Sequence, residues 1–294
     1  MNSEDALQGR IIKGIGGFYY IDTERGIYES KARGIFRKEG ITPLVGDMCE
    51  IDIVDEEQKI GNITGILPRK SALIRPAAAN ADQAVMIFAI KKPELSTGLL
   101  DRFLMNMEKQ NLETVIVFSK NDLDDADRLM NIYGNAGYKV LSISNKTMEG
   151  IDKLRDILKG KISVLSGPSG VGKSSLINSL LEQEYAETGE LSEKIGRGKN
   201  TTRHTELISL GEDTYIMDTP GYSSIEIMCD DADEVSYGFR EMRPYLGKCR
   251  FTGCSHVAEP DCAVKKAVED GAVSQERYES YVRIYEAVKA VRKY

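Results

Sequence analysis

The spacing of hydrophobic and polar positions changes twice along this 294-residue chain. Over residues 1–70, short segments rich in Ile, Val and Tyr are separated by Gly, Asp and Pro and show no helical period. We expect strands at 11–15, 17–21, 26–32, 48–54 and 59–66. Five short strands without a helix favour a small closed β-barrel, and an OB-fold has that number of strands.

Beyond residue 81, apolar runs typical of buried strands alternate with helical patterns. The expected strands are 84–90, 114–118, 139–143 and 162–165, and the expected helices are 99–109, 124–135 and 150–158. This alternation predicts a parallel sheet with helices on both faces. A helix should follow Gly172, and two more strands are expected at 206–210 and 214–217.

The stretch from Gly238 onward shows a third pattern, with clustered cysteines and a closing helix. Apolar and aromatic residues recur at helical spacing in that helix, which is typical of core packing: Tyr278, Tyr281, Val282, Tyr285, Val288 and Val291. We therefore expect a multidomain α/β protein with a β-barrel at 1–70, an α/β domain at 71–228 and a small C-terminal domain at 229–294.

Composition and charge narrow the class of protein. Hydrophobic residues make up 41% and charged residues 29%, which fits a folded rather than a disordered chain. The longest apolar run, 84–90, is too short to span a membrane, and the N-terminus lacks a secretory pattern, so we expect a cytoplasmic protein. The net charge of −7 argues against nucleic-acid binding over the whole surface. Basic residues nevertheless gather locally, at Arg25, Lys31, Arg33, Arg37 and Lys38.

A phosphate-binding loop is the strongest chemical signal. The sequence GPSGVGKS, Gly167 to Ser174, fits G-x-x-x-x-G-K-[ST] and lies between the strand 162–165 and a helix at 175–181. Glycines let backbone N–H groups turn toward phosphates, and the helix N-terminus favours negative charge. Lys173 would reach the β- and γ-phosphates, and the Ser174 hydroxyl would bind Mg²⁺. The expected nucleotide contacts here are Gly167, Pro168, Ser169, Gly170, Val171, Gly172, Lys173, Ser174 and Ser175.

Two downstream segments complete the phosphate side of the site. Asp218 ends the strand 214–217 and begins the sequence DTPG, so it is the expected carboxylate near Mg²⁺. Gly221 would let a backbone N–H approach the γ-phosphate. The polar loop 196–204 offers Thr201 or Thr202 to Mg²⁺, and we favour Thr202. The expected catalytic residues are Lys173, Thr202 and Gly221.

The apolar strand 114–118 leads into a segment that resembles a guanine-recognition element. Asp122 would accept from the N1–H and the exocyclic amine of the base, beside Lys120 and Asn121. Ser119 stands where an Asn is expected and lacks the amide that would brace the site. Ser142, near the end of the next strand, is a plausible third contact to the base.

A cysteine–histidine cluster indicates a metal site. The pattern Cys249-x₄-Cys254-x-His256-x₅-Cys262 offers three thiolates and one imidazole, the donor set of a structural Zn²⁺ site. Because the number of cysteines is odd, five, and the chain is expected to be cytosolic, a framework of disulfide bonds is not expected. Cys49 and Cys229 are expected to be small apolar core residues.

The order of these elements is rotated relative to ordinary GTPases. Base-recognition residues precede the phosphate loop, as in a circular permutation, which is tolerated when the original termini lie close together. The chain resembles the circularly permuted, ribosome small-subunit-dependent GTPases of bacteria over nearly its whole length. The segments that carry this resemblance are GRIIKGIGGFYYI, VGDMCEIDI, LPRKSALIRPAAANADQ, GPSGVGKSSLIN, RGKNTTRH, DTPGYSS and CRFTGCSHVAEPDC.

The resemblance implies an N-terminal OB-fold β-barrel, a circularly permuted P-loop GTPase domain and a small zinc-binding helical domain. It also implies GTP hydrolysis stimulated by the 30S subunit late in its maturation, with the OB-fold on 16S rRNA. The implied cofactors are GTP/GDP, Mg²⁺ and one structural Zn²⁺. We expect a monomer that does not contact membranes.

Two departures from the usual motifs leave alternatives open. Asn200 stands where the family usually has His, with His204 nearby, and Tyr222 follows Gly221 where Ras-like GTPases have a water-orienting Gln, so slow intrinsic turnover is expected. One alternative is therefore a nucleotide-gated binding module with little turnover. Another, suggested by Ser119, is an ATP-dependent enzyme, which we place last because Asp122 has no comparable role toward adenine.

Overall fold

The computed structural model describes residues 7–34, 36, 40–74, 77–188, 205–218, 227–229 and 231–291. These residues fall into two compact units. The first comprises the chain up to Ala84 together with 155–166 and 177–221, and the second comprises 85–154, 167–176 and 222–294. The sequence-based domains 1–70, 71–228 and 229–294 stay a prediction.

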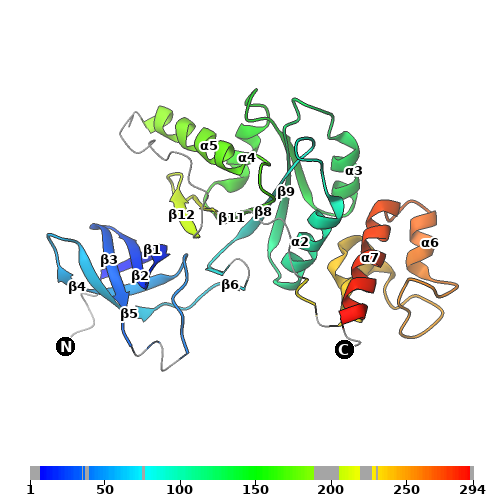
Figure 1. Ribbon diagram of the computed structural model, residues 1–294, viewed down its shortest axis with the longest axis horizontal. Helices are drawn as coiled ribbons and strands as arrows, with labels where there is room; N and C mark the ends of the chain where they lie inside the picture. Colours follow the sequence, from blue (N-terminus) through cyan, green and yellow to red (C-terminus); the bar gives the residue numbers. More distant parts are fainter. Residues whose placement is uncertain are drawn as a thin grey trace. The chain divides into compact units, whose positions relative to one another are not determined.

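The first unit begins with a closed five-stranded barrel (Figure 1). Its strands are β1 (Leu7–Ile15), β2 (Phe18–Thr23), β3 (Gly26–Ala32), β4 (Met48–Asp55) and β5 (Ile60–Ile66). They follow the order β1-β2-β3-β5-β4, and β4 pairs back onto β1, which closes the barrel. The β3–β5 pair is parallel and the others are antiparallel. Residues pointing inward form the core, namely Leu7, Ile11, Ile21, Tyr28, Phe36, Cys49, Ile51 and Ile63. The predicted OB-fold barrel is confirmed.

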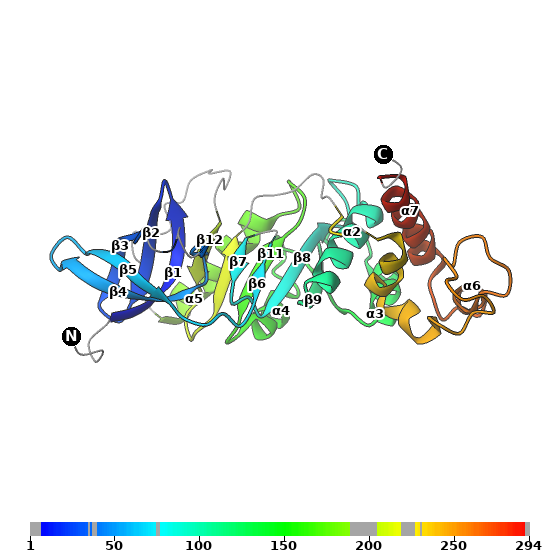
Figure 2. The ribbon, with the colours of Figure 1, turned by 90° about the horizontal axis from the view of Figure 1, so that it is seen from below.

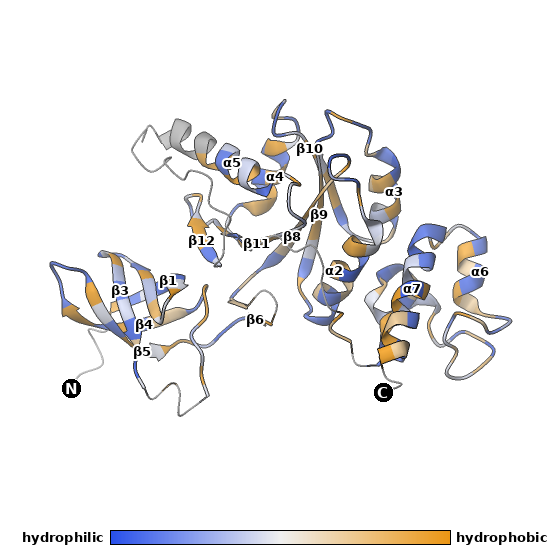
Figure 3. Cartoon of the chain, in the orientation of Figure 1, coloured by the Kyte–Doolittle hydropathy of each residue, from blue (hydrophilic) through white to orange (hydrophobic). Residues whose placement is uncertain are grey.

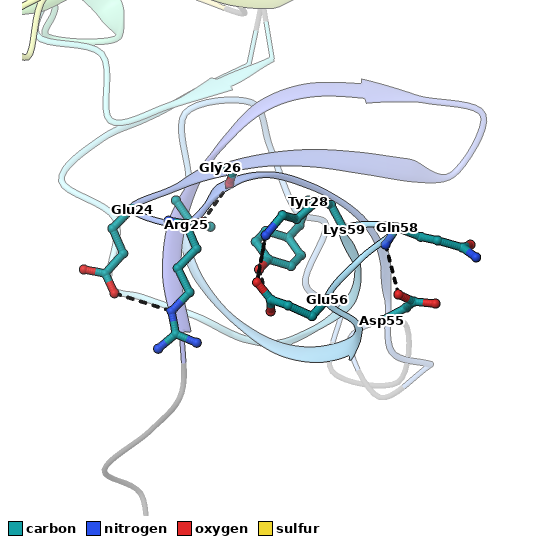
Figure 4. A network of polar contacts seen from close by, with 9 residues as sticks. Glu24, Arg25, Gly26, Tyr28, Asp55, Glu56, Gln58 and Lys59 are labelled. Atoms are coloured by element: carbon teal, nitrogen blue, oxygen red, sulfur yellow. Dashed lines mark hydrogen bonds and ion pairs between the residues drawn. The ribbon is translucent and has the colours of Figure 1, made fainter.

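A polar network fixes the turn between β4 and β5 at one end of the barrel (Figure 4). The ring of Tyr28 is fully buried, and its hydroxyl donates to the Glu56 carboxylate at 2.8 and 2.9 Å. Lys59 Nζ lies 2.7 Å from Glu56 Oε1 and 5.0 Å from the centre of the Tyr28 ring. Hydrogen bonds from Lys59 and then Tyr28 lower the pKa of Glu56, so the carboxylate stays charged and keeps the turn against β3.

The rest of the first unit adds short strands beyond the barrel. β6 (Ala72–Leu73) pairs with β7 (Ala78–Ala79), and β11 (Ile162–Ser166) lies parallel to β13 (Tyr215–Asp218). β12 (Glu206–Ser209) is antiparallel to β13, so the two strands predicted after the phosphate loop do not both continue the parallel pattern. A short turn with positive φ at Gly211, Glu212 and Asp213 joins the two strands as a hairpin, whereas a parallel pair would need a longer crossover.

Most of β8 (Gln83–Ala89) lies in the second unit, together with its neighbours in the sheet, β9 (Glu113–Ser119) and β10 (Lys139–Ile143). β8 and β9 are labelled side by side in Figures 1 and 2, and β10 is labelled in Figure 3. β9 and β10 are parallel. Every residue of β8 is buried and only the first residue of β9 is exposed, so both faces of these strands are covered. The alternating helices are α2 (Thr97–Lys109), α3 (Asp127–Asn135) and α4 (Ile151–Leu158), close to the predicted ranges. The helix after Gly172, α5 (Lys173–Thr188), begins earlier and runs further than predicted.

The C-terminal part of the second unit has its own hydrophobic core. It consists of the 3₁₀ helices η2 (Ala232–Gly238) and η3 (Arg240–Tyr245) and the helices α6 (Ala263–Glu269) and α7 (Gln275–Val291). Hydrophobic residues recur along α7 among hydrophilic ones (Figure 3). Tyr281, Tyr285 and Val288 pack into this core as predicted, but Val291 is 79% exposed because α7 extends past the core at its end. No helix in the described ranges is long and apolar enough to cross a membrane.

A buried arginine ties α7 to the helix α2. Arg277 is 2% exposed, and its guanidinium donates to Asp101 Oδ1 at 2.5 Å and to Glu241 at 2.7 and 3.2 Å. Tyr133 from α3 donates to the same Asp101 oxygen at 3.0 Å, and the ring of Phe239 lies 4.5 Å from the guanidinium carbon. This network therefore joins α2, α3, η3 and α7 through charged groups that are removed from water.

Candidate functional site

The phosphate loop occupies the turn from β11 into α5, the context that the motif requires. Gly167 has φ +152°, and a Cβ there would come within 2.1 Å of the carbonyl oxygen of Ile87, so no larger residue fits. Lys173 Nζ donates to the carbonyls of Gly167 at 2.7 Å and Pro168 at 3.0 Å. The amine therefore lies across the loop, where it is able to meet phosphate oxygens.

The end of β9 and the residue after it are held against the phosphate loop by two side chains. Ser119, 1% exposed, donates its hydroxyl hydrogen to the carbonyl of Val171 at 2.6 Å. Lys120 Nζ donates to Gly170 O at 2.7 Å and also to the carbonyl of Lys92. Ser119 lacks the amide expected at this position, but its shorter hydroxyl reaches the loop carbonyl directly. The structure thus brings the predicted base and phosphate segments together.

Asp122 is oriented by a residue that sequence reasoning missed. Ser144 is fully buried, and its hydroxyl donates to Asp122 Oδ1 at 2.8 Å while accepting from the N–H groups of Lys146 and Thr147. The predicted Ser142 lies two residues earlier, within β10, in register with Phe118 of β9. The repeated serine in Ser142–Ile143–Ser144 was the available signal, since only the residue after the strand can turn toward Asp122. Asn121 donates its N–H to Ile143 O at 3.1 Å.

Of the residues expected near Mg²⁺, Ser174 and Asp218 lie within the described residues. Ser174 is exposed on the first turn of α5, as is Ser175. Asp218 ends β13 at 9% exposure and is paired in register with Leu165 of β11. Ser174 and Asp218 each carry an oxygen donor of the kind that Mg²⁺ prefers. Thr201, Thr202, Gly221, Asn200, His204 and Tyr222 lie outside the described residues.

The four predicted metal ligands converge on one point near the start of α6. Their donor atoms all lie within 4.8 Å of one another: Cys249, Cys254, His256 and Cys262. Cys249 Sγ is 3.8 Å from Cys262 Sγ, and His256 Nδ1 is 3.4 Å from each of these two sulfurs. A tetrahedral ion with Zn–S bonds of about 2.3 Å separates its sulfurs by about 3.8 Å, so the spacing fits Zn²⁺.

Burial shifts the pKa values of Cys254, His256 and Cys262. It raises the pKa of Cys254 to about 12 and also raises that of Cys262, whereas it lowers the pKa of His256. The imidazole is therefore neutral and ready to bind a metal at neutral pH, and the thiols of Cys254 and Cys262 need a cation before they lose their protons. The cluster suggests a zinc site on its chemistry as well as its geometry.

The backbone around the cluster is anchored to α7. Tyr278 donates to the carbonyl of His256 at 2.8 Å, and Tyr281 donates to that of Ser255 at 2.5 Å. Burial opposes the ionisation of Glu259, but hydrogen bonds from the backbone and hydroxyl of Ser255 and from Val257 outweigh it and lower the pKa of Glu259 to about 2. Hydrogen bonds from α7 and to Glu259 therefore hold the backbone at Ser255 and His256 independently of a metal.

Comparison with known families gives two matches along the chain. A model of the RsgA N-terminal domain matches residues 8–63, and a model of the RsgA GTPase matches residues 66–228. Two curated relatives are both named "Small ribosomal subunit biogenesis GTPase RsgA". The one from Agathobacter rectalis is 48% identical and covers 98% of this chain and 100% of its own length. The one from Caldanaerobacter subterraneus subsp. tengcongensis is 47% identical and covers 98% of both chains.

Two solved structures share the fold over nearly the whole chain. The first is described as YloQ, a circularly permuted GTPase, with a TM-score of 0.78, 36% identity and coverage of 99% of this chain and 97% of its own. The second is YjeQ from Thermotoga maritima, with a TM-score of 0.79, 36% identity and coverage of 97% and 99%. The element order predicted from the motifs is thus that of a circularly permuted GTPase fold.

Proposed function

Because the chain belongs to the RsgA GTPase family and is a GTP hydrolase, we propose that it binds the small (30S) ribosomal subunit in the cytoplasm and hydrolyses GTP to GDP and phosphate during late maturation of that subunit. The observation that carries this proposal is the nearly complete coverage of the chain by relatives whose names state that role. We also propose that the protein acts as a monomer.

The proposed chemistry is attack of water on the γ-phosphorus with cleavage of the bond to the oxygen that bridges the β- and γ-phosphates. Backbone N–H groups of the phosphate loop bind the phosphates, and Lys173 balances their charge. Mg²⁺, when bound, would supply further neutralisation of the phosphate charge. Ser174 and Thr202 would hold that ion, Asp218 would supply a carboxylate, and the backbone N–H of Gly221 would approach the γ-phosphate.

Base recognition in this proposal falls to the segment after β9. Asp122 accepts from the N1–H and the exocyclic amine of guanine, and Ser144 fixes the orientation of that carboxylate. Lys120 lies between the base segment and the phosphate loop. Guanine selection therefore depends on the same turn that supports the phosphate loop.

In this proposal the C-terminal segment supports the fold through a metal site, and the N-terminal barrel contacts the ribosome. One structural Zn²⁺ at Cys249, Cys254, His256 and Cys262 stabilises the C-terminal segment. The barrel binds 16S rRNA through its basic side chains. Lys31 is exposed on β3 and lies 4.7 Å from the centre of the Phe18 ring, a pairing of charge and aromatic surface suited to RNA.

The decisive experiment is GTP hydrolysis by the full chain with and without purified 30S subunits. Supplying a missing catalytic group is worth about 10³–10⁵ in other GTPases, so stimulation of about tenfold or more is expected. The 50S subunit serves as the control for unspecific stimulation. Hydrolysis that 30S subunits leave unchanged would instead support a nucleotide-gated binding module with little turnover.

A second experiment tests the contact with rRNA. Binding to 30S subunits should weaken as salt rises, with a logarithmic slope of about −0.7 to −0.9 for each phosphate contacted. Lys31→Glu should reduce the size of that slope by about one unit. Lys159→Glu, at an exposed lysine paired with Glu212, is the matched control. A slope of zero in the unmodified protein would remove the electrostatic part of the proposal.

A further inference from the structure

Three consecutive carbonyl groups of the phosphate loop accept hydrogen bonds from side chains at the end of β9 or just after β9 and β10. The pairs are Lys120 Nζ to Gly170 O at 2.7 Å, Ser119 Oγ to Val171 O at 2.6 Å and Asn145 Nδ2 to Gly172 O at 3.2 Å. All six residues belong to the second compact unit. The outer side of the loop is therefore held by the base-recognition segments at every peptide between Gly170 and Lys173.

This arrangement determines where the loop N–H groups point. In a trans peptide, the carbonyl and the following N–H point in opposite directions. Holding the three carbonyls therefore directs the N–H groups of Val171, Gly172 and Lys173 to the other side of the loop. Gly170 and Gly172 have φ +79° and +97°, and their alternation with Val171 is typical of backbone turns that gather N–H groups around an anion.

Asn145 donates to the carbonyl of Gly172, but the amide oxygen of the same side chain is left unpaired within the part of the chain that the structure describes. Its Oδ1 is buried and has no hydrogen-bond partner among the described residues, which destabilises the folded state. The carbonyl of Gly172 also accepts from the N–H of Leu176 at 2.9 Å, so Asn145 uses the second lone pair of an acceptor at the start of α5. An amide kept in this position despite an unpaired oxygen points to a role in shaping the loop.

We infer that Ser119 and Asn145 are positioning residues that hold the phosphate-binding N–H groups of the loop without contacting the base. The inference rests on the proposed nucleotide site and deepens it. Backbone N–H groups at these positions bind the α- and β-phosphates of a nucleotide. Binding of GDP and GTP should therefore depend on both side chains, whereas discrimination between guanine and other bases should not.

Equilibrium titration of the full chain with GDP, GMP and XDP tests this inference. Ser119→Ala and Asn145→Ala should each weaken GDP binding about tenfold, the effect of one buried hydrogen bond. The affinity for GMP, which has an α-phosphate but no β-phosphate, should fall less than that for GDP, and the ratio of GDP to XDP affinity should not change. Ser119→Thr, which keeps the hydroxyl, should restore GDP binding. Thr147→Ala, at an exposed side chain two residues from Asn145, is the control.

Three other results of these titrations would overturn the inference. A changed GDP-to-XDP ratio would mean that a side chain contacts the base and would overturn the inference, as would unchanged GDP affinity. An equal loss for GDP and GMP would also overturn it, because the role would then be general stability. Ser119→Cys preserves the shape with a weaker donor and serves if the alanine variant does not fold. Failure of the unmodified protein to bind GDP would contradict the proposed function instead.

Discussion

Replacing Arg277 by Met removes the positive charge of the buried network and nearly preserves its volume. The side chains of Asp101 and Glu241 are 1% and 4% exposed, so neither carboxylate is able to recover its hydration. Removing one partner of a buried ion pair costs about 3–5 kcal/mol. Because Arg277 serves two carboxylates, we expect Arg277→Met to lower the free energy of unfolding by an amount in the upper half of this range.

Arg250→Met is the matched control for the effect of burial. Arg250 lies 2.7 Å from Asp261, the same distance as Arg277 from Glu241, but its side chain is 69% exposed. Exposed ion pairs contribute about 0–1 kcal/mol. Neutralising the whole buried network with Arg277→Met, Asp101→Asn and Glu241→Gln together should recover at least half of the loss, since no unpaired charge remains.

The assay is urea unfolding followed by tyrosine fluorescence, because the chain has 14 Tyr and no Trp. A zinc indicator in the same experiment identifies the transition in which the C-terminal segment unfolds, since a multidomain chain need not unfold in one step. If Arg277→Met and Arg250→Met differed by less than about 1 kcal/mol, the reasoning from burial would be refuted.

Three further predictions concern the candidate site. Lys173→Ala should abolish GTP hydrolysis in a steady-state phosphate assay, and residual turnover near the unmodified rate would contradict the role of its amine. Asp122→Asn should weaken GTP and favour xanthosine triphosphate in competition binding, because the amide donates where the carboxylate accepts; an unchanged base preference would exclude this residue from the base site. Cys254→Ser should release zinc and lower the melting temperature of the C-terminal segment, measured by metal analysis and calorimetry, whereas Cys49→Ser should retain the metal.

The strand β8, the phosphate loop and the metal ligands could be predicted because each depends on a short, local sequence pattern. The apolar run 84–90 gave β8 because a strand covered on both faces needs no alternation, and its residues are all buried. The phosphate loop and the metal ligands have fixed spacings that chemistry requires, and the four metal donors do converge. α6 was missed because two buried residues, Val264 and Ala267, do not establish a period over seven residues.

Contacts between distant segments could not be predicted in the same way. Arg277 looks like a solvated cation next to the stripe of α7, and its burial depends on Asp101, 176 positions away in the chain. The brace from Ser119 depends on where the carbonyl of Val171 lies, and a backbone atom leaves no signature in the sequence. The antiparallel β12 follows from a turn whose φ values only the structure supplies.

The rotated order of the site has a consequence during protein synthesis. The nascent chain carries Asp122 before Lys173 has been added, and at about 5–20 residues per second the delay amounts to several seconds. Through that interval, Ser119 has no loop carbonyl to hold, and neither does Asn145 once it has been added. Nucleotide capture by a newly made molecule therefore waits for the second half of the chain, and the nucleotide cannot assist folding of the first.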